Sequence, residues 1–108
     1  FIALLNIRRV FLQKFYSMTF SETGLNKNIQ KAINDLGFET PTPIQKEVIP
    51  YLLETENDLI ALAQTGTGKT AAFGMPVIHK IEVDRKNPQA IILCPTRELC
   101  LQIAKDME

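Results

Sequence analysis

The feature that most constrains this chain is a glycine-rich segment, Ala63-Gln64-Thr65-Gly66-Thr67-Gly68-Lys69-Thr70. It follows a short apolar run, residues 59–63, whose length and composition are typical of a strand covered on both faces. A stretch with helical spacing, residues 69–81, comes directly after it. A strand, a glycine-rich turn and a helix in this order are the surroundings that a phosphate-binding loop requires.

The residue types of this segment suit contact with a nucleotide triphosphate. Gly66 and Gly68 allow a tight turn that presents backbone N–H groups to phosphate oxygens. Lys69 supplies a mobile cation, and Thr70 supplies a hydroxyl for Mg²⁺. We therefore expect the nucleotide to be held by eight residues, Ala63, Gln64, Thr65, Gly66, Thr67, Gly68, Lys69 and Thr70. The simpler alternative is a glycine-rich turn that merely joins a strand to a helix.

The remaining pattern predicts an α/β domain. Helical spacing covers residues 25–36, and Thr42-Pro43 predicts the cap and first turn of a second helix. Residues 90–93 are a second buried-strand candidate, followed by a last helix with Leu99, Ile103 and Met107 facing inward. This order predicts parallel strands with flanking helices, preceded by two helices. Two strands do not make a stable parallel sheet, so we expect residues 18–108 to be the opening part of a larger domain.

A second segment, Gly37-Phe38-Glu39-Thr40-Pro41-Thr42-Pro43-Ile44-Gln45, precedes the loop. Its prolines could simply organise a helix start. Its place upstream of a phosphate loop suggests adenine recognition instead, because the amide of Gln45 can both donate to and accept from the edge of the base. Phe20, seventeen residues before Gly37, offers an aromatic face on which the base could stack.

With Phe20 upstream, this segment resembles the Q motif of DEAD-box RNA helicases. Residues 63–70 resemble motif I of that family, including its opening alanine. Pro95-Thr96-Arg97-Glu98-Leu99-Cys100 is similar to motif Ia, with Cys100 where alanine is usual. The resemblance runs from about Thr19 to Glu108, and the three motifs have the family's order and spacing.

The resemblance implies an incomplete RecA-like P-loop NTPase domain that binds ATP and Mg²⁺. It implies that Gln45 reads adenine, that Phe20 stacks on it, and that Lys69 is catalytic. It assigns contact with the RNA backbone to Pro95, Thr96, Arg97 and Glu98. Without the family resemblance, the sequence suggests only that Thr96 caps a helix and that Arg97 is a solvent-exposed charge. Cys100 is expected to face the core as a neutral replacement.

The implied activity is that of an ATP-dependent RNA helicase, with a second RecA-like domain as a partner. The Asp-Glu-Ala-Asp motif and the arginine finger of the family are not among these residues, so we expect the segment alone to bind nucleotide without hydrolysing it. Three alternatives stay open: a nucleotide-binding module without helicase activity, another P-loop enzyme such as a small-molecule kinase, and a DNA helicase of a related family.

Composition says little more about the functional class of the protein. Formal net charge is zero, and no stretch reaches the eighteen or so apolar residues needed to span a bilayer. Cys94 and Cys100 fit no zinc or CxxC spacing, which favours free thiols and a reducing, cytoplasmic location. Residues 1–17 are basic and lack acids; we interpret them as a non-native or leader segment, with a mitochondrial transit peptide or a native helix as alternatives.

Overall fold

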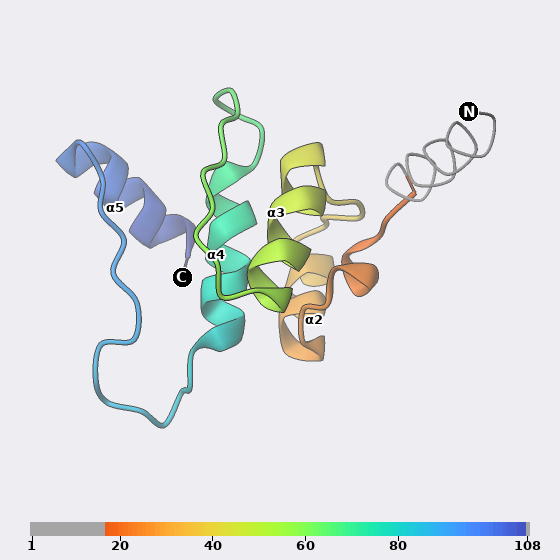
Figure 1. Cartoon of the computed structure of the whole chain (residues 1–108), viewed down its shortest axis with the longest axis horizontal. Coiled ribbons are helices and arrows are strands. Elements are labelled where there is room, and N and C mark those ends of the chain that lie inside the picture. The colour runs from red at the N-terminus through yellow and green to blue at the C-terminus, as the bar shows by residue number, and fades with distance from the viewer. Residues whose placement is uncertain (1–16, 108) are drawn as a thin grey trace.

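A computed structural model describes residues 17–107, so most of the expected leader segment, residues 1–17, lies outside the described residues. Within this part the secondary structure is helical (Figure 1). Its elements are the 3₁₀ turn η1 (Phe20–Thr23) and the α-helices α2 (Lys27–Asp35), α3 (Pro43–Glu54), α4 (Lys69–Lys80) and α5 (Arg97–Asp106). The last three begin within one or two residues of the starts predicted from the sequence, at proline or capping signals and at the glycine-rich loop.

Residues 17–36, the first part of the chain that the structure describes, form an N-terminal arm. Thr23 Oγ1 donates a 2.7 Å hydrogen bond to Phe20 O and closes η1, a turn that the sequence pattern did not predict. Asn26 caps α2, because its Oδ1 accepts from Ile29 N at 3.0 Å. The helix therefore begins two residues later than predicted. Leu36, expected on the apolar face, is 74% exposed and lies beyond the last helical residue.

Helices α3 and α4 pack against each other (Figure 1). Buried apolar residues from η1, the link between η1 and α2, α2 and α3 form one cluster, and partly buried side chains from α2, α3 and α4 pack against it. The buried members are Phe20, Leu25, Ile33 and Ile49, and the partly buried members are Ile29, Leu53 and Met75. Within α3, the apolar residues Val48 and Ile49 are buried.

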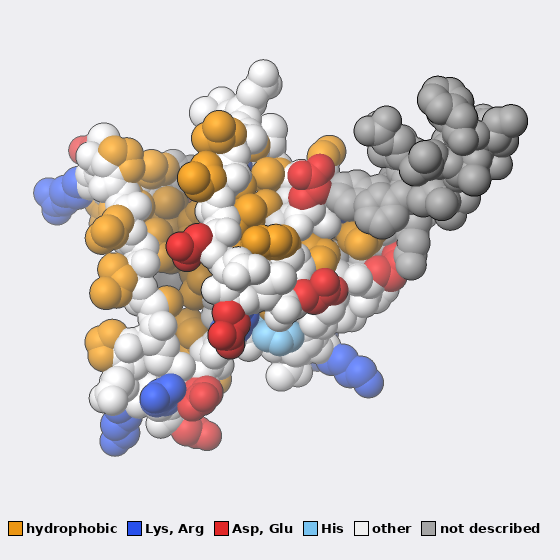
Figure 2. All heavy atoms as spheres, viewed as in Figure 1, with side chains coloured by type: hydrophobic (Ala, Val, Ile, Leu, Met, Phe, Trp, Pro, Cys, Tyr) orange, Lys and Arg blue, Asp and Glu red, His pale blue; other side chains and the backbone are white. Residues whose placement is uncertain are grey.

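The two expected strands are not confirmed, because residues 17–107 contain no strand. Residues 58–64 and 88–94 run in the same direction, opposite to α4 (Figure 1), and no backbone hydrogen bond described for this part of the chain joins them. The expectation that these runs are buried is wrong for this chain: Ile60 is 88% exposed, Leu62 91% and Leu93 89%. Figure 2 shows their apolar side chains at the surface.

The C-terminal helix α5 returns toward α4 from the far end of residues 88–94 (Figure 1). Its end packs on α4 at Gly74, where an added Cβ would lie 3.7 Å from Met107 Cε. Of the residues expected to face inward, Ile103 and Met107 are half-buried and Leu99 is 41% exposed. No helix in the described residues combines the length and apolar character needed to cross a membrane.

Candidate nucleotide-binding site

The glycine-rich loop turns from the extended segment into α4 through two glycines in the left-handed region. Gly66 has φ 76° and Gly68 has φ 83°, values that side-chain-bearing residues rarely adopt. The first hydrogen bond of α4 runs from Ala72 N to Gly68 O at 3.0 Å. The N–H groups of Lys69, Thr70 and Ala71 precede it and have no acceptor within the helix. The loop therefore presents donors at the positive end of a helix dipole, which is an anion-binding arrangement.

Lys69 curls back over its own loop. Its ammonium Nζ donates to Gln64 O at 2.7 Å and also to Ala63 O. Thr67 Oγ1 donates to the same Gln64 carbonyl at 2.7 Å, so the turn is closed by side-chain contacts. A bound triphosphate would draw the ammonium away from these carbonyls, because a phosphate oxygen carries far more negative charge.

The loop is joined to the beginning of α3 by two side chains. Gln45 Nε2 donates to Gly68 O at 3.2 Å, and Gln45 Oε1 accepts from Thr42 N at 3.0 Å. Thr42 Oγ1 donates to Thr67 O at 2.9 Å. Gln45 is buried, with 6% of its surface exposed. The segment resembling the Q motif is thus physically coupled to the phosphate loop, 23 and 25 positions further along the chain.

Thr42 is a contact residue of the loop to which sequence reasoning gave no role of its own. The pattern predicted it correctly as the N-cap position of α3, and its hydroxyl also reaches the loop. The signal that could have pointed to it is its place three residues before Gln45, which puts both side chains over the first turn of the helix. What they contact depends on where α4 lies, and helical spacing does not reveal that.

Phe20 lies at the edge of the same region. It is 5% exposed and packs in the cluster with Ile49, which is one helical turn from Gln45 on the same face of α3. Its burial shows that the ring contributes to the core. Its predicted stacking on adenine stays a prediction, as do the contacts predicted for Ala63, Gln64 and Thr65, of which the last two are exposed.

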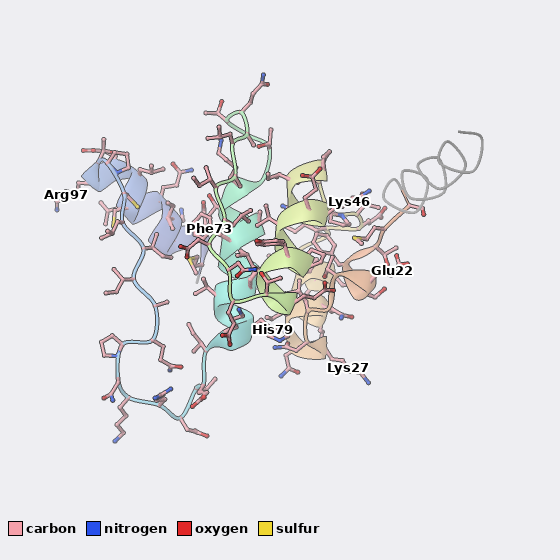
Figure 3. All side chains as sticks on the ribbon, viewed as in Figure 1. Glu22, Lys27, Lys46, Phe73, His79 and Arg97 are labelled. Carbon is pink, nitrogen blue, oxygen red and sulfur yellow. The ribbon has the colours of Figure 1, made fainter. Side chains whose placement is uncertain are left out.

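The motif predicted to contact RNA forms the start of α5. Thr96 Oγ1 accepts from Leu99 N at 3.3 Å, which confirms the helix cap. Arg97 projects outward from this end of the helix (Figure 3), and Pro95 and Glu98 are also exposed. The N-terminal ends of α3, α4 and α5 lie at one end of the molecule (Figure 1). The predicted phosphate and RNA contacts therefore share one end of the fold, and the RNA contacts themselves stay a prediction.

The two cysteines flank this motif as free thiols. Partial burial raises the pKa of Cys94, and the neighbouring Cys100 raises it further through its charge and a side-chain hydrogen bond. The expectation that Cys100 faces the core is wrong, because Cys100 is exposed. Cys100 interacts with Cys94 of the extended segment 88–94, and this segment forms no strand within the described residues.

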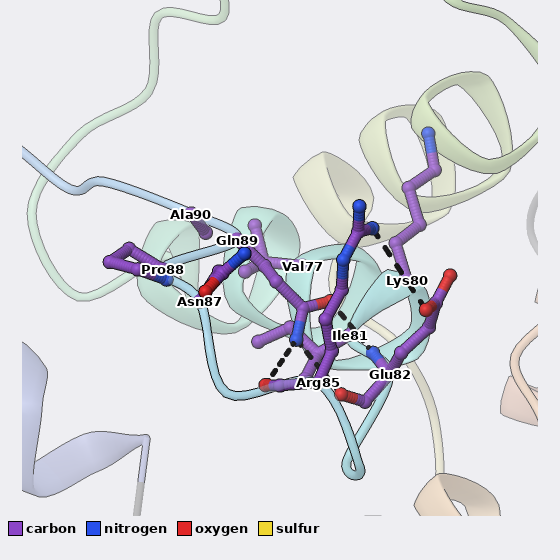
Figure 4. A pocket seen from close by; sticks show the side chains of 9 residues that line it. All are labelled: Val77, Lys80, Ile81, Glu82, Arg85, Asn87, Pro88, Gln89 and Ala90. Atoms are coloured by element: carbon purple, nitrogen blue, oxygen red, sulfur yellow. Dashed lines mark hydrogen bonds and ion pairs between the residues drawn. The ribbon is translucent and has the colours of Figure 1, made fainter.

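An open pocket of about 510 Å³ lies at the opposite end of α4 from the phosphate loop (Figure 4). It is formed by the last turns of α4 and the following loop, in which Gln89 accepts from Glu82 N at 2.9 Å and donates to Glu82 O at 2.8 Å. It contains none of the residues predicted to bind nucleotide or RNA. The pocket is therefore not part of the candidate site.

This geometry defines a class: a glycine-rich loop at a helix N-terminus, joined by a hydrogen bond to an upstream glutamine, is the arrangement of a P-loop domain. The sequence profile of the DEAD/DEAH box helicase family matches residues 42–108. The chain belongs to the DEAD/DEAH box helicase family.

Proteins with similar sequences support this family membership. The chain is 56% identical over 88 residues to the ATP-dependent RNA helicase CshA of Listeria monocytogenes, covering 82% of this chain and 17% of that protein. It is 50% identical over 91 residues to the ATP-dependent RNA helicase DeaD of Haemophilus influenzae, covering 84% of this chain and 15% of that protein. The chain thus spans about a sixth of the length of these relatives.

Solved structures show the same fold. A DEAD box protein from Methanococcus jannaschii matches with a TM-score of 0.78 and 47% identity, over 83% of this chain and 24% of that one. A variant of Saccharomyces cerevisiae Dbp5, bound to RNA and ADP–BeF3, matches with a TM-score of 0.78 and 38% identity, over 82% of this chain and 23% of that one. The helices described above therefore belong to a helicase RecA-like domain.

Proposed function

We propose that this chain is the ATP-binding part of an ATP-dependent RNA helicase, and that it binds ATP through residues 63–70 with adenine against Gln45. The observation that carries the proposal is the coupling of Gln45 to Gly68. This hydrogen bond supports the proposal because it joins a side-chain amide, which could pair with adenine, to the residue that precedes the N–H groups at the start of α4. A structure of a relative, Dbp5, is described as bound to RNA and ADP–BeF3.

The residues present fit a magnesium nucleotide. Thr70 lies in the first turn of α4, half-buried beside Lys69, where its hydroxyl would be one ligand of Mg²⁺. The described residues hold no group of three or more acidic, His or Cys side chains that could bind a metal ion unaided. The ion would therefore arrive with the phosphates, whose charge it neutralises. Lys69 would hold the β- and γ-phosphates, and we propose binding without turnover for this chain.

Titration calorimetry with three ligands tests the nucleotide site: MgATP, MgGTP and inorganic tripolyphosphate. Lys69→Ala should weaken all three by at least tenfold, because each shares the phosphate contacts. Lys80→Ala removes a lysine from the other end of α4 and should leave all three unchanged. Equal ATP affinity for Lys69→Ala and the unmodified chain would contradict the proposal.

Gln45→Ala separates the two roles of the glutamine. Loss of adenine reading lowers ATP affinity but not tripolyphosphate affinity, whereas removal of the hydrogen bond to Gly68 lowers both. We expect both effects, with the larger decrease for ATP. An ATP-to-GTP ratio that does not change in this variant would favour another P-loop enzyme, such as a small-molecule kinase, over a helicase.

We further propose that the start of α5 contacts an RNA backbone, as its exposed Arg97 and capped helix end allow. Fluorescence anisotropy with a single-stranded RNA tests this. Arg97→Ala should weaken binding and reduce the salt dependence by about 0.7 in log–log slope for each phosphate that the arginine neutralises. Arg85→Ala removes the same charge at the pocket end and is the matched control. Equal effects of the two variants would indicate nonspecific attraction and leave a nucleotide-binding module without RNA activity.

A further inference from the structure

A hydrogen bond joins the N-terminal arm to the far end of α4. The backbone N–H of Asn26 donates to His79 Nδ1 at 3.1 Å, across 53 positions of sequence. His79 lies in the last turn of α4, beside α2 (Figure 3), and Asn26 is the cap of α2. In this contact the ring nitrogen Nδ1 is the acceptor. His79 is the single histidine of the sequence.

The contact fixes one end of a short segment whose other end is Phe20. Leu25 is 3% exposed in the core, and its carbonyl accepts from Gln30 Nε2 at 2.5 Å. Asn26 is held twice, by its Oδ1 to Ile29 N and by its N–H to His79. The segment from Phe20 to Asn26 is therefore anchored by packing at its start and by His79 at its end.

Helix α4 connects this anchor to the nucleotide site. Its first turn carries Lys69 and Thr70, and its last turn carries His79. Phe20 packs in the cluster with Ile49, one turn from Gln45 on α3. The same helix thus follows the phosphate loop at one end and contacts the segment that carries Phe20 at the other.

We propose that His79 is a positioning residue for the adenine side of the site. By holding the cap of α2 against α4, it keeps the Phe20 segment in register with Gln45 and the phosphate loop, without touching the nucleotide. This inference rests on the proposed function. It implies that His79 affects the affinity for ATP but not the affinity for a ligand that lacks the base, because the phosphates would contact the opposite end of α4.

A pair of variants at Asn26 isolates the hydrogen bond. Asn26→Ala keeps the N–H that binds His79 but loses the Oδ1 cap. Asn26→Pro loses both, and the φ of −67° at this position is one that proline adopts. The difference between these two variants therefore reports the hydrogen bond to His79. His79→Ala removes the acceptor, whereas His79→Gln retains one on a side chain that can reach across.

Calorimetry with MgATP and inorganic tripolyphosphate on the 108-residue chain, with thermal melting alongside, gives the test. We expect His79→Ala to weaken ATP binding by about three- to tenfold, with tripolyphosphate within about twofold and His79→Gln partly restored. In the Asn26→Ala background, His79→Ala should still weaken ATP binding. In the Asn26→Pro background it should cause no further loss of ATP affinity, because the hydrogen bond is already absent and the two sites are coupled.

Two results would overturn the inference. Parallel decreases in ATP and tripolyphosphate affinity, or none, would show that His79 contributes only to the stability of the fold. Equal effects of His79→Ala in the two Asn26 backgrounds would show that the hydrogen bond is not the cause. Either result leaves the proposed function intact, provided that the unmodified chain binds ATP and Lys69→Ala does not. No ATP binding by the unmodified chain overturns both proposals.

Discussion

Gln45 Nε2 lies 3.2 Å from Gly68 O, and the absence of a side chain at Gly68 is what permits this approach. A Cβ built at Gly68 would overlap with the same nitrogen. Glycine at this position therefore serves two needs, a left-handed backbone and room for the amide of α3. Gly66 serves the first need alone, because nothing lies within 4 Å of a Cβ built there.

This difference predicts unequal effects of the two glycine substitutions. Gly66→Ala should cost about 1 kcal/mol in free energy of unfolding, from the positive φ of 76°. Gly68→Ala should cost about 1–2 kcal/mol more, because Gln45 must move and its hydrogen bond is broken. Urea denaturation measures both. In a Gln45→Ala background the extra cost of Gly68→Ala should largely disappear; an undiminished gap would show that the clash is not with Gln45.

Some apolar residues of this chain are buried in the core and others are exposed at the surface. We therefore expect the same substitution to change the free energy of unfolding differently at a buried and at an exposed isoleucine. Ile49 is fully buried and Ile60 is 88% exposed. Ile49→Val should lower the free energy of unfolding by about 0.5–1.5 kcal/mol, the usual effect of removing a buried methylene. Ile60→Val should stay within about 0.5 kcal/mol of zero. Equal decreases in urea denaturation would mean that residues 58–64 are covered in solution.

Much of the helical fold was predictable because its signals are local. Thr42-Pro43 marks the start of α3, the glycine-rich loop marks the start of α4, and Thr96 caps α5. The strands could not be predicted in this way, because a strand exists only when the backbone groups of a neighbouring segment pair with it. Ile60 and Leu93 have strand-like sequence surroundings, but no partner is described for either segment within residues 17–107.

In the candidate site, too, local features were predictable from the sequence and long-range contacts were not. Residues 66–70 reveal their chemistry through type and spacing, so the loop was predictable. The contacts of Gln45 and Thr42 with the loop, and that of Asn26 with His79, join residues 23 to 53 positions apart. No periodicity encodes such contacts, because they arise from how α2, α3 and α4 pack. The wrong expectation that Cys100 faces the core has the same origin, because burial of a helix face depends on what packs against it.

The cap of α5 predicts a stability effect that is separable from RNA contact. Thr96→Ala removes the oxygen that accepts from Leu99 N and should lower the free energy of unfolding by about 1 kcal/mol. Thr96→Ser keeps the oxygen and should restore most of this stability. If RNA binding follows the cap, anisotropy will recover with serine. A serine variant as unstable as the alanine variant would mean that the threonine methyl, not its hydroxyl, stabilises this end.

The thiol pair predicts a pH-dependent difference in reactivity. The pKa of Cys94 is raised, first by desolvation and then by Cys100, so less of Cys94 is thiolate near neutral pH than in an unperturbed thiol. Because the thiolate is the nucleophile, iodoacetamide should modify the exposed Cys100 before Cys94. Peptide mass spectrometry over a time course at about pH 7.5, below the usual thiol pKa, resolves the two rates.

Replacing Cys100 with serine removes its charge from beside Cys94 but leaves desolvation, the largest cause of the raised pKa of Cys94. In Cys100→Ser, Cys94 should therefore react faster than in the unmodified chain, yet still more slowly than a free cysteine peptide. Raising the pH should speed the alkylation of Cys94, because more of its thiol is then ionised. Faster alkylation of Cys94 than of Cys100 in the unmodified chain would contradict this arrangement, since desolvation of Cys94 disfavours its charged form.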